Sequence, residues 1–155
     1  MESGRGRVRI NRLAPTGETL VAYHFDFDPI HRIARFRLEG HFSDKEVHEY
    51  YTAATRFATL TNPAAGLLDA SGVTSFDVSS ETIHELASLP PNIAGLHVPR
   101  VLIAPSPAVF GMMRMFGMLG ERTRPNLHVV RTEREALAIL GVVNPRFEPV
   151  PEWNT

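Results

Sequence analysis

The sequence predicts an α/β fold: an N-terminal β-hairpin followed by a helix and then three strand–helix units. Two observations predict it. Alternating apolar and polar residues near the N-terminus describe two consecutive strands. Beyond the first long amphipathic segment, short apolar runs alternate three times with segments of helical periodicity. Because crossover helices join parallel strands, we expect a mixed, mainly parallel sheet with the helices packed on it.

The hairpin is predicted between residues 21 and 38. Apolar side chains alternate with polar ones over 21–27 and again over 34–38, and the dipeptide Asp28-Pro29 between them is typical of a turn. In this hairpin Asp26 and Arg35 are expected to pair across the two strands.

Capping signals mark the first and last helices. Ser43 and Glu46 have the spacing of a capping box, and this first helix should end at the Asn62-Pro63 break. Thr132 and Glu135 form a second capping box for the last helix, which Gly141 can end.

Three short apolar runs are predicted to be parallel strands, each followed by a helix. The runs are 66–68, 101–103 and 127–130. The helices that follow them begin near Ser80, Pro107 and Thr132.

Length and composition indicate one domain. The chain has 155 residues, of which 43% are hydrophobic, and this suffices for a single core. We assign residues 18–143 to that domain, residues 1–17 to a flexible basic arm, and residues 144–155 to a proline-rich tail that Trp153 can dock.

Several functional classes lack their sequence signals. A net charge of −1 gives no electrostatic reason to bind nucleic acid, and the absence of cysteine excludes disulfides and thiolate chemistry. No apolar run is long enough to cross a bilayer and no signal peptide is evident, so we expect a cytoplasmic protein. His41, Asp44 and His48 are too few for a metal site, and phosphate-binding glycine motifs are absent, so we expect no metal and no cofactor.

The segment from Asp69 to Ser80 is the most informative stretch. It follows the apolar run 66–68 and precedes a helix, so we interpret it as a loop at the carboxyl end of a strand, where α/β proteins bind ligands and partners. The candidate contact residues are the polar and small ones of this loop: Asp69, Ser71, Gly72, Thr74, Asp77, Ser79 and Ser80.

This segment resembles the signature of the STAS domain, the fold of bacterial anti-anti-sigma factors. Asp69, Ser71, Val73 and Asp77 fall in register with the family motif, while Val78 and Ser80 stand where the family has serine and glycine. The chain is similar above all to SpoIIAA-like proteins, through the segments 72–77 and 114–116. The resemblance implies a non-enzymatic regulatory module that binds a protein partner.

The same resemblance places the phosphorylatable serine of the family at Ser79. A phosphate there would lie at a helix N-terminus, beside Asp77, and could switch a protein contact. The alternative role for Ser79 is that of an ordinary helix cap, and both interpretations stay open at this point.

The predicted helix 107–119 is apolar on nearly all sides and rich in methionine. Its most apolar positions are Phe110, Met112, Met113, Met115 and Phe116. Such a surface can line a pocket for a lipid or another apolar molecule, form a contact between two copies of the chain, or be buried as ordinary core.

Two functional hypotheses follow from the sequence. The first is a non-enzymatic STAS-like module that contacts a protein through the segment 69–80. The alternative is a carrier or sensor of an apolar small molecule that uses the helix 107–119. No complete catalytic constellation supports an enzyme.

Overall fold

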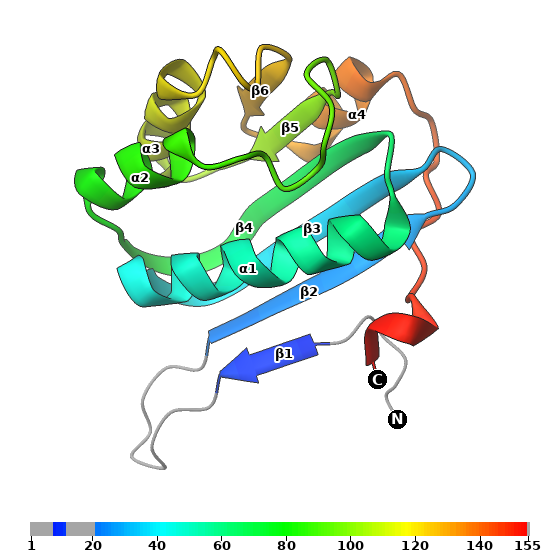
Figure 1. Ribbon diagram of the computed structural model, residues 1–155, viewed down its shortest axis with the longest axis horizontal. Coiled ribbons are helices and arrows are strands. Elements are labelled where there is room, and N and C mark those ends of the chain that lie inside the picture. The colour runs from blue at the N-terminus through cyan, green and yellow to red at the C-terminus, as the bar shows by residue number, and fades with distance from the viewer. Residues whose placement is uncertain (1–7, 12–20, 155) are drawn as a thin grey trace.

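The fold is organised around one twisted mixed sheet (Figure 1). The computed structural model describes residues 8–11 and 21–154. Within these residues the strands lie side by side in chain order: β1 (Val8–Asn11), β2 (Val21–Asp28), β3 (Ile33–Ser43), β4 (Ala65–Asp77), β5 (Arg100–Ile103) and β6 (Leu127–Val130). The pairs β1–β2 and β2–β3 are antiparallel, and the remaining pairs are parallel. The predicted fold class is confirmed.

The helices cover the two faces of the sheet unequally. The four α-helices are α1 (Asp44–Thr61), α2 (Ser80–Ser88), α3 (Pro107–Leu119) and α4 (Glu133–Leu140), and the short 3₁₀ helix η1 (Pro151–Asn154) ends the described chain. Leu67 packs with α4, whereas the next residue, Leu68, packs with α1 and α3. Because successive side chains of a strand point to opposite faces, α4 covers one face and the other helices cover the opposite one. None of the described helices is long and apolar enough to span a membrane.

The hairpin forms as predicted, with a salt bridge across it. Asp26 is the register partner of Arg35, whose Nε and one Nη donate to the two carboxylate oxygens over 2.9 and 2.6 Å. On the opposite face, Phe25 packs against Phe36 and Phe57. The alternation in sequence therefore separates a polar face from an aromatic core.

The predicted helix boundaries hold where caps define them. Ser43 and Glu46 form the capping box of α1, and Asn62 ends that helix in a left-handed conformation with φ of 48°. Thr132 and Glu135 form the second capping box, at α4, which Gly141 ends with φ of 71°.

The loop interpretation of residues 69–77 is wrong, because these residues continue β4. They pair with β3 as far as Asp77, opposite Ser43, and two register shifts take up the extra residues of β4. Gly72 is needed at one of them, since a Cβ there would lie 2.8 Å from Cγ of Glu39. The serines and glycine that resemble a turn in sequence are part of a bulged strand.

Both ends of the described chain are more ordered than the sequence suggests. The predicted flexible arm 1–17 contains β1, which pairs with β2, while the rest of that segment lies outside the described residues. The tail forms a backbone bridge between Glu148 and Phe27, and the indole of Trp153 lies 5.2 Å from the ring of Phe57. The predicted docking of Trp153 is confirmed, and the tail is part of the core.

Asp28 joins the hairpin turn to the tail. This fully buried carboxylate accepts from the backbone N–H groups of Ile30, His31 and Arg146, and the ring of His31 lies 2.9 Å from its Oδ2. Burial opposes the negative charge, but the hydrogen bonds outweigh it and lower the pKa of Asp28 below its usual value.

We predict that Asp28→Asn lowers the free energy of unfolding by about 1–3 kcal/mol at neutral pH, because the amide cannot accept all these bonds. Since the folded pKa is depressed, the stabilisation by Asp28 is complete above the unfolded pKa and is lost as the pH falls toward the folded one. Urea denaturation of both proteins from neutral to acidic pH should therefore show a difference that narrows in acid. A constant difference would contradict the role of the charge, and Asp77→Asn, at an exposed site, is the control.

Candidate functional site

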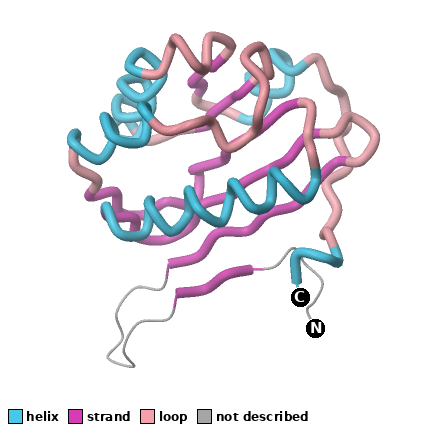
Figure 2. Tube along the Cα trace, in the orientation of Figure 1, coloured by secondary structure: helices cyan, strands magenta, loops and turns pink. Residues whose placement is uncertain are grey.

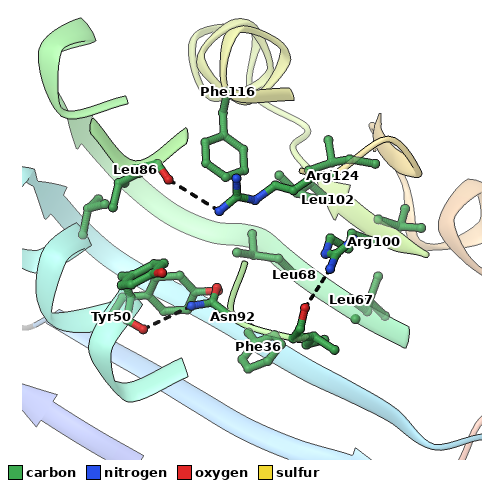
Figure 3. A pocket seen from close by; sticks show the side chains of 16 residues that line it. Phe36, Tyr50, Leu67, Leu68, Leu86, Asn92, Arg100, Leu102, Phe116 and Arg124 are labelled. Carbon is green, nitrogen blue, oxygen red and sulfur yellow. Dashed lines mark hydrogen bonds between the residues drawn. The ribbon is translucent and has the colours of Figure 1, made fainter. Parts of the chain in front are cut away.

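A partly enclosed cavity lies between the sheet and the helices of its more covered face (Figure 3). Its volume is about 120 Å³, and its walls are mostly apolar. The strands contribute Phe36, Gly66, Leu68, Arg100, Leu102 and Leu127, and the helices and connections contribute Val47, Tyr50, Tyr51, Leu86, Asn92, Ile93, Phe116 and Arg124. Cavities of about 150 Å³ lined by apolar side chains bind molecules the size of benzene, so a small ligand fits this space.

The segment 89–98, which connects α2 to β5, closes one side of the cavity. Ile93 reaches down to the sheet at Gly66, where a Cβ would lie 2.7 Å from Cδ1 of Ile93. Asn92 donates from its side-chain amide to Thr55 Oγ1 and to the carbonyl of Tyr51 on α1. The absence of a side chain at Gly66 therefore permits the segment to lie against the strands.

Arg100 holds this segment from the sheet side. Although it is the first residue of β5, its side chain is buried and donates to the carbonyls of Ile93, Gly95 and Val98 over 2.7 to 3.0 Å. Three of its five N–H groups are used in this way among the described residues, so further donors are available to a bound molecule.

Arg124 holds the end of α2 from the other side of the cavity. Its guanidinium is buried, donates to the carbonyls of Leu86, Ala87 and Leu89, and stacks over the ring of Phe116 at 4.8 Å. The last carbonyls of a helix carry partial negative charge, so a cation there is favourable.

No carboxylate of the described residues forms an ion pair with either guanidinium. The ion pairs of the described residues include Arg35 and Arg37 but neither Arg100 nor Arg124. Burial lowers the pKa of both groups, and the charge of Arg124 lowers that of Arg100 further. Arginine remains protonated at neutral pH, so the apolar cavity carries two positive charges. Among the described residues, backbone and hydroxyl dipoles and the ring of Phe116 offset them.

Tyr50 adds a neutral donor to the same cavity. Its ring packs edge-on against Phe25 and Phe36. Burial raises the pKa of its hydroxyl, so the group stays protonated. In the described part of the chain no hydrogen bond to this hydroxyl is formed, so it is free to donate to a ligand.

The methionine-rich helix contributes less to this site than predicted. Of its five candidates only Phe116 lines the cavity, while Met113 is buried against Leu102 and Val109. Met112 and Met115 pack at the edge of the core, and Phe110 stacks under Arg131 at 4.1 Å. The helix closes the cavity chiefly through one aromatic ring.

The candidates on segment 69–80 lie elsewhere, along the extension of β4. None of them lines the cavity. Ser71, Gly72, Thr74 and Asp77 are exposed on the strand, and Asp69 accepts from the backbone N–H of Ser71. Ser80 is the first residue of α2 and is also exposed. The sequence thus identified a polar surface, not the wall of a pocket.

Ser79 is the N-cap of α2. Its Oγ accepts from the backbone N–H of Thr82 and donates to Asp44 Oδ2 over 3.0 Å, while its own backbone N–H donates to Asp44 Oδ1 over 2.8 Å. These hydrogen bonds lower the pKa of Asp44. Ser79 therefore ties the beginning of α2 to the beginning of α1.

The histidines considered for a metal site have other partners. His41 lies in β3, with its Nδ1 2.9 Å from Ser75 Oγ. His48 lies between the carbonyl of Asp44 and the carboxylate of Glu85, which links α1 to α2. Among the described residues, no three acidic or histidine side chains converge on a point that could hold a metal ion.

Sequence reasoning missed the two arginines that define the cavity. Arg100 precedes the apolar run 101–103, and a charged residue at the edge of a buried strand was the available signal. Arg124, in a connection after α3, carries no local signal at all.

Comparisons with known proteins give this chain no family. Neither the family models nor the curated proteins include a match to it. The likeness to STAS and SpoIIAA-like proteins consequently rests on the residues quoted for it.

We predict that Ser79→Ala lowers the free energy of unfolding by about 1 kcal/mol, because the cap of α2 and the tie to Asp44 are both lost. Thermal or urea denaturation followed by circular dichroism measures the change. Ser80→Ala is the matched control, since it alters an exposed serine in the first turn of the same helix. Equal effects of the two substitutions would contradict the capping role.

Proposed function

We propose that the protein is a non-enzymatic binding protein for a small carboxylic acid with an apolar body, held in the cavity between the sheet and the helices α1, α2 and α3. One observation carries this proposal: an apolar cavity contains two buried guanidiniums that no carboxylate of the described residues pairs with.

The charges favour an anionic ligand over a neutral one. Buried charges are costly unless a partner of opposite sign approaches them. A carboxylate in the cavity would receive charge-assisted hydrogen bonds from the remaining N–H groups of Arg100 and a further bond from Tyr50. The apolar part of the ligand would lie against side chains such as Leu68 and Phe116.

The size of the cavity favours a compact molecule. A volume of about 120 Å³ suits one aromatic ring or a short branched chain. A longer lipid would have to extend past the segment 89–98 into solvent. The proposal therefore narrows the apolar carrier hypothesis to small acids.

Benzoate and benzyl alcohol test this proposal, since they share a ring and differ in charge. We expect benzoate to shift the methyl NMR signals of residues at the cavity and to bind at least roughly tenfold more tightly than benzyl alcohol, because a hydrogen bond to a charged group is worth more than a neutral one. Arg100→Met should abolish that preference, and Arg100→Lys should keep part of it. Arg122→Met, which removes an exposed arginine, is the control.

Two results would contradict the proposal. One is the absence of shifts at the cavity with either compound. The other is equal affinity for both compounds in the unaltered protein. Leu68→Trp, which fills the cavity, should remove benzoate binding, whereas Leu60→Trp at an exposed position should not.

A second candidate function is protein binding along the extension of β4, as in the STAS-like hypothesis. The observation that favours it is the edge of this strand: β5 pairs with β4 only as far as Asp69, so beyond that residue the edge facing β5 has no neighbouring strand in the described chain. A partner segment could add to such an edge. Phosphorylation of Ser79 would place a dianion against Asp44 and break the tie between α1 and α2.

Intact-protein mass spectrometry on material from the native host tests this switch. We expect the mass of one phosphate that survives denaturation and maps to Ser79. Unmodified Ser79 under all growth conditions tested would contradict the switch. Extra mass that is present only under native conditions would instead identify a bound small molecule.

A further inference from the structure

The strand β6 forms an open edge of the sheet. It pairs with β5 on one side, and no other strand in the described chain pairs with its outer side. The carbonyls of Asn126 and Val130 face β5, since they accept hydrogen bonds from the backbone N–H groups of Arg100 and of Ala104, the residue after β5. Since backbone groups alternate in direction along a strand, the N–H and C=O groups of Leu127 and Val129 point outward. An edge of this kind is a template for another strand.

A groove runs along this edge. Its volume is about 400 Å³, and its walls come from β6, α3 and α4. Met118 on α3 is 65% exposed and Ile139 on α4 is 41% exposed, so large apolar side chains flank the strand on both faces of the sheet. Exposed apolar groups on both sides of an unpaired strand are typical of an interaction surface.

The charges in the groove are self-complementary. Arg114 and Glu121 are both exposed, line the groove, and stand seven residues apart on and just after α3. Their midpoint falls between Gly117 and Met118. A two-fold axis at that point would bring Arg114 of one protomer to Glu121 of the partner subunit, and the reverse.

The strand has its own midpoint close to the same place. A symmetric antiparallel pairing of two β6 strands would centre on His128, so that Leu127 of one protomer lies opposite Val129 of the partner subunit and their outward groups meet. Gly117 lies directly above this strand, because a Cβ at Gly117 would be 2.9 Å from Cδ2 of Leu127. A single two-fold axis perpendicular to the sheet can therefore relate both the two copies of α3 and the two copies of β6.

We propose that two copies of the chain associate through β6, with antiparallel pairing of the two edge strands into one continuous sheet and with α3 beside its symmetry mate. The apolar groups Met118 and Ile139 become covered on the two faces of the joined sheet. Two pairs formed by Arg114 and Glu121 fix the antiparallel register. A second copy is favoured over an unrelated peptide because the charges of the groove complement themselves.

Analytical ultracentrifugation of the full chain over a concentration series tests the proposal. We expect a reversible dimer. Arg114→Glu and Glu121→Arg should each raise the dissociation constant by at least roughly tenfold, because symmetry turns two attractive pairs into repulsive ones at once. The variant that carries both substitutions restores opposite charges and should return toward the original value. Arg122→Glu, outside the groove, is the control.

A second variant tests the strand contact itself. Val129→Pro removes an outward N–H group, and proline is tolerated on edge strands at such positions, so the protomer should stay folded by circular dichroism while the dimer is lost. A monomer at all concentrations would overturn the proposal. A dimer that is unaffected by the charge variants and by Val129→Pro would also overturn it, because the contact would lie elsewhere.

Discussion

The arrangement of α1, α2 and α3 over the sheet depends on two buried guanidiniums that donate hydrogen bonds to backbone carbonyls. Arg100 holds the segment 89–98 from the sheet, and Arg124 holds the end of α2. Without the bonds from Arg100 the connection between α2 and β5 would lose its polar anchor on the sheet side and would depend on the hydrogen bonds of Asn92 to α1. Because carbonyl dipoles offset a full charge only in part, the same bonds leave the cavity positive. The packing of this face and the ligand preference that we propose would thus have one origin.

The two faces of the sheet differ in how they are covered. One face is closed by α4 and by Phe147 of the C-terminal segment around Ile33, Leu67 and Val101. The other face carries α1, α2 and α3 (Figure 2). The cavity lies between these helices and the sheet. Tyr50, Phe116 and the segment 89–98 meet there although they are distant in sequence. The proposed binding site therefore depends on how the sheet and the helices are spaced.

The sequence predicted the elements correctly where local signals were strong. Alternation of apolar residues predicted the hairpin and the pairing of Asp26 with Arg35, and capping boxes at Ser43 and Thr132 predicted the beginnings of α1 and α4. The prediction failed at residues 69–77, where serine and glycine suggest a turn. Pairing with the long strand β3 overrides that composition, since bulges absorb the extra residues and Gly72 permits a close approach.

From β2 to α4 the sequence by itself determined the order and type of the elements, although not the extension of β4, because periodicity and caps act over a few residues. For Ser79 it left a helix cap and a phosphorylation site both open, and the structure shows that Ser79 is the N-cap of α2. Only the tertiary structure decided which residues meet: Arg100 and Arg124 share a cavity, and Arg114, Glu121 and β6 share an open edge. Contacts between residues so distant in sequence depend on which strands become neighbours and on how closely the helices approach them. No local pattern along the chain encodes that spacing, so the candidate site became visible only after folding.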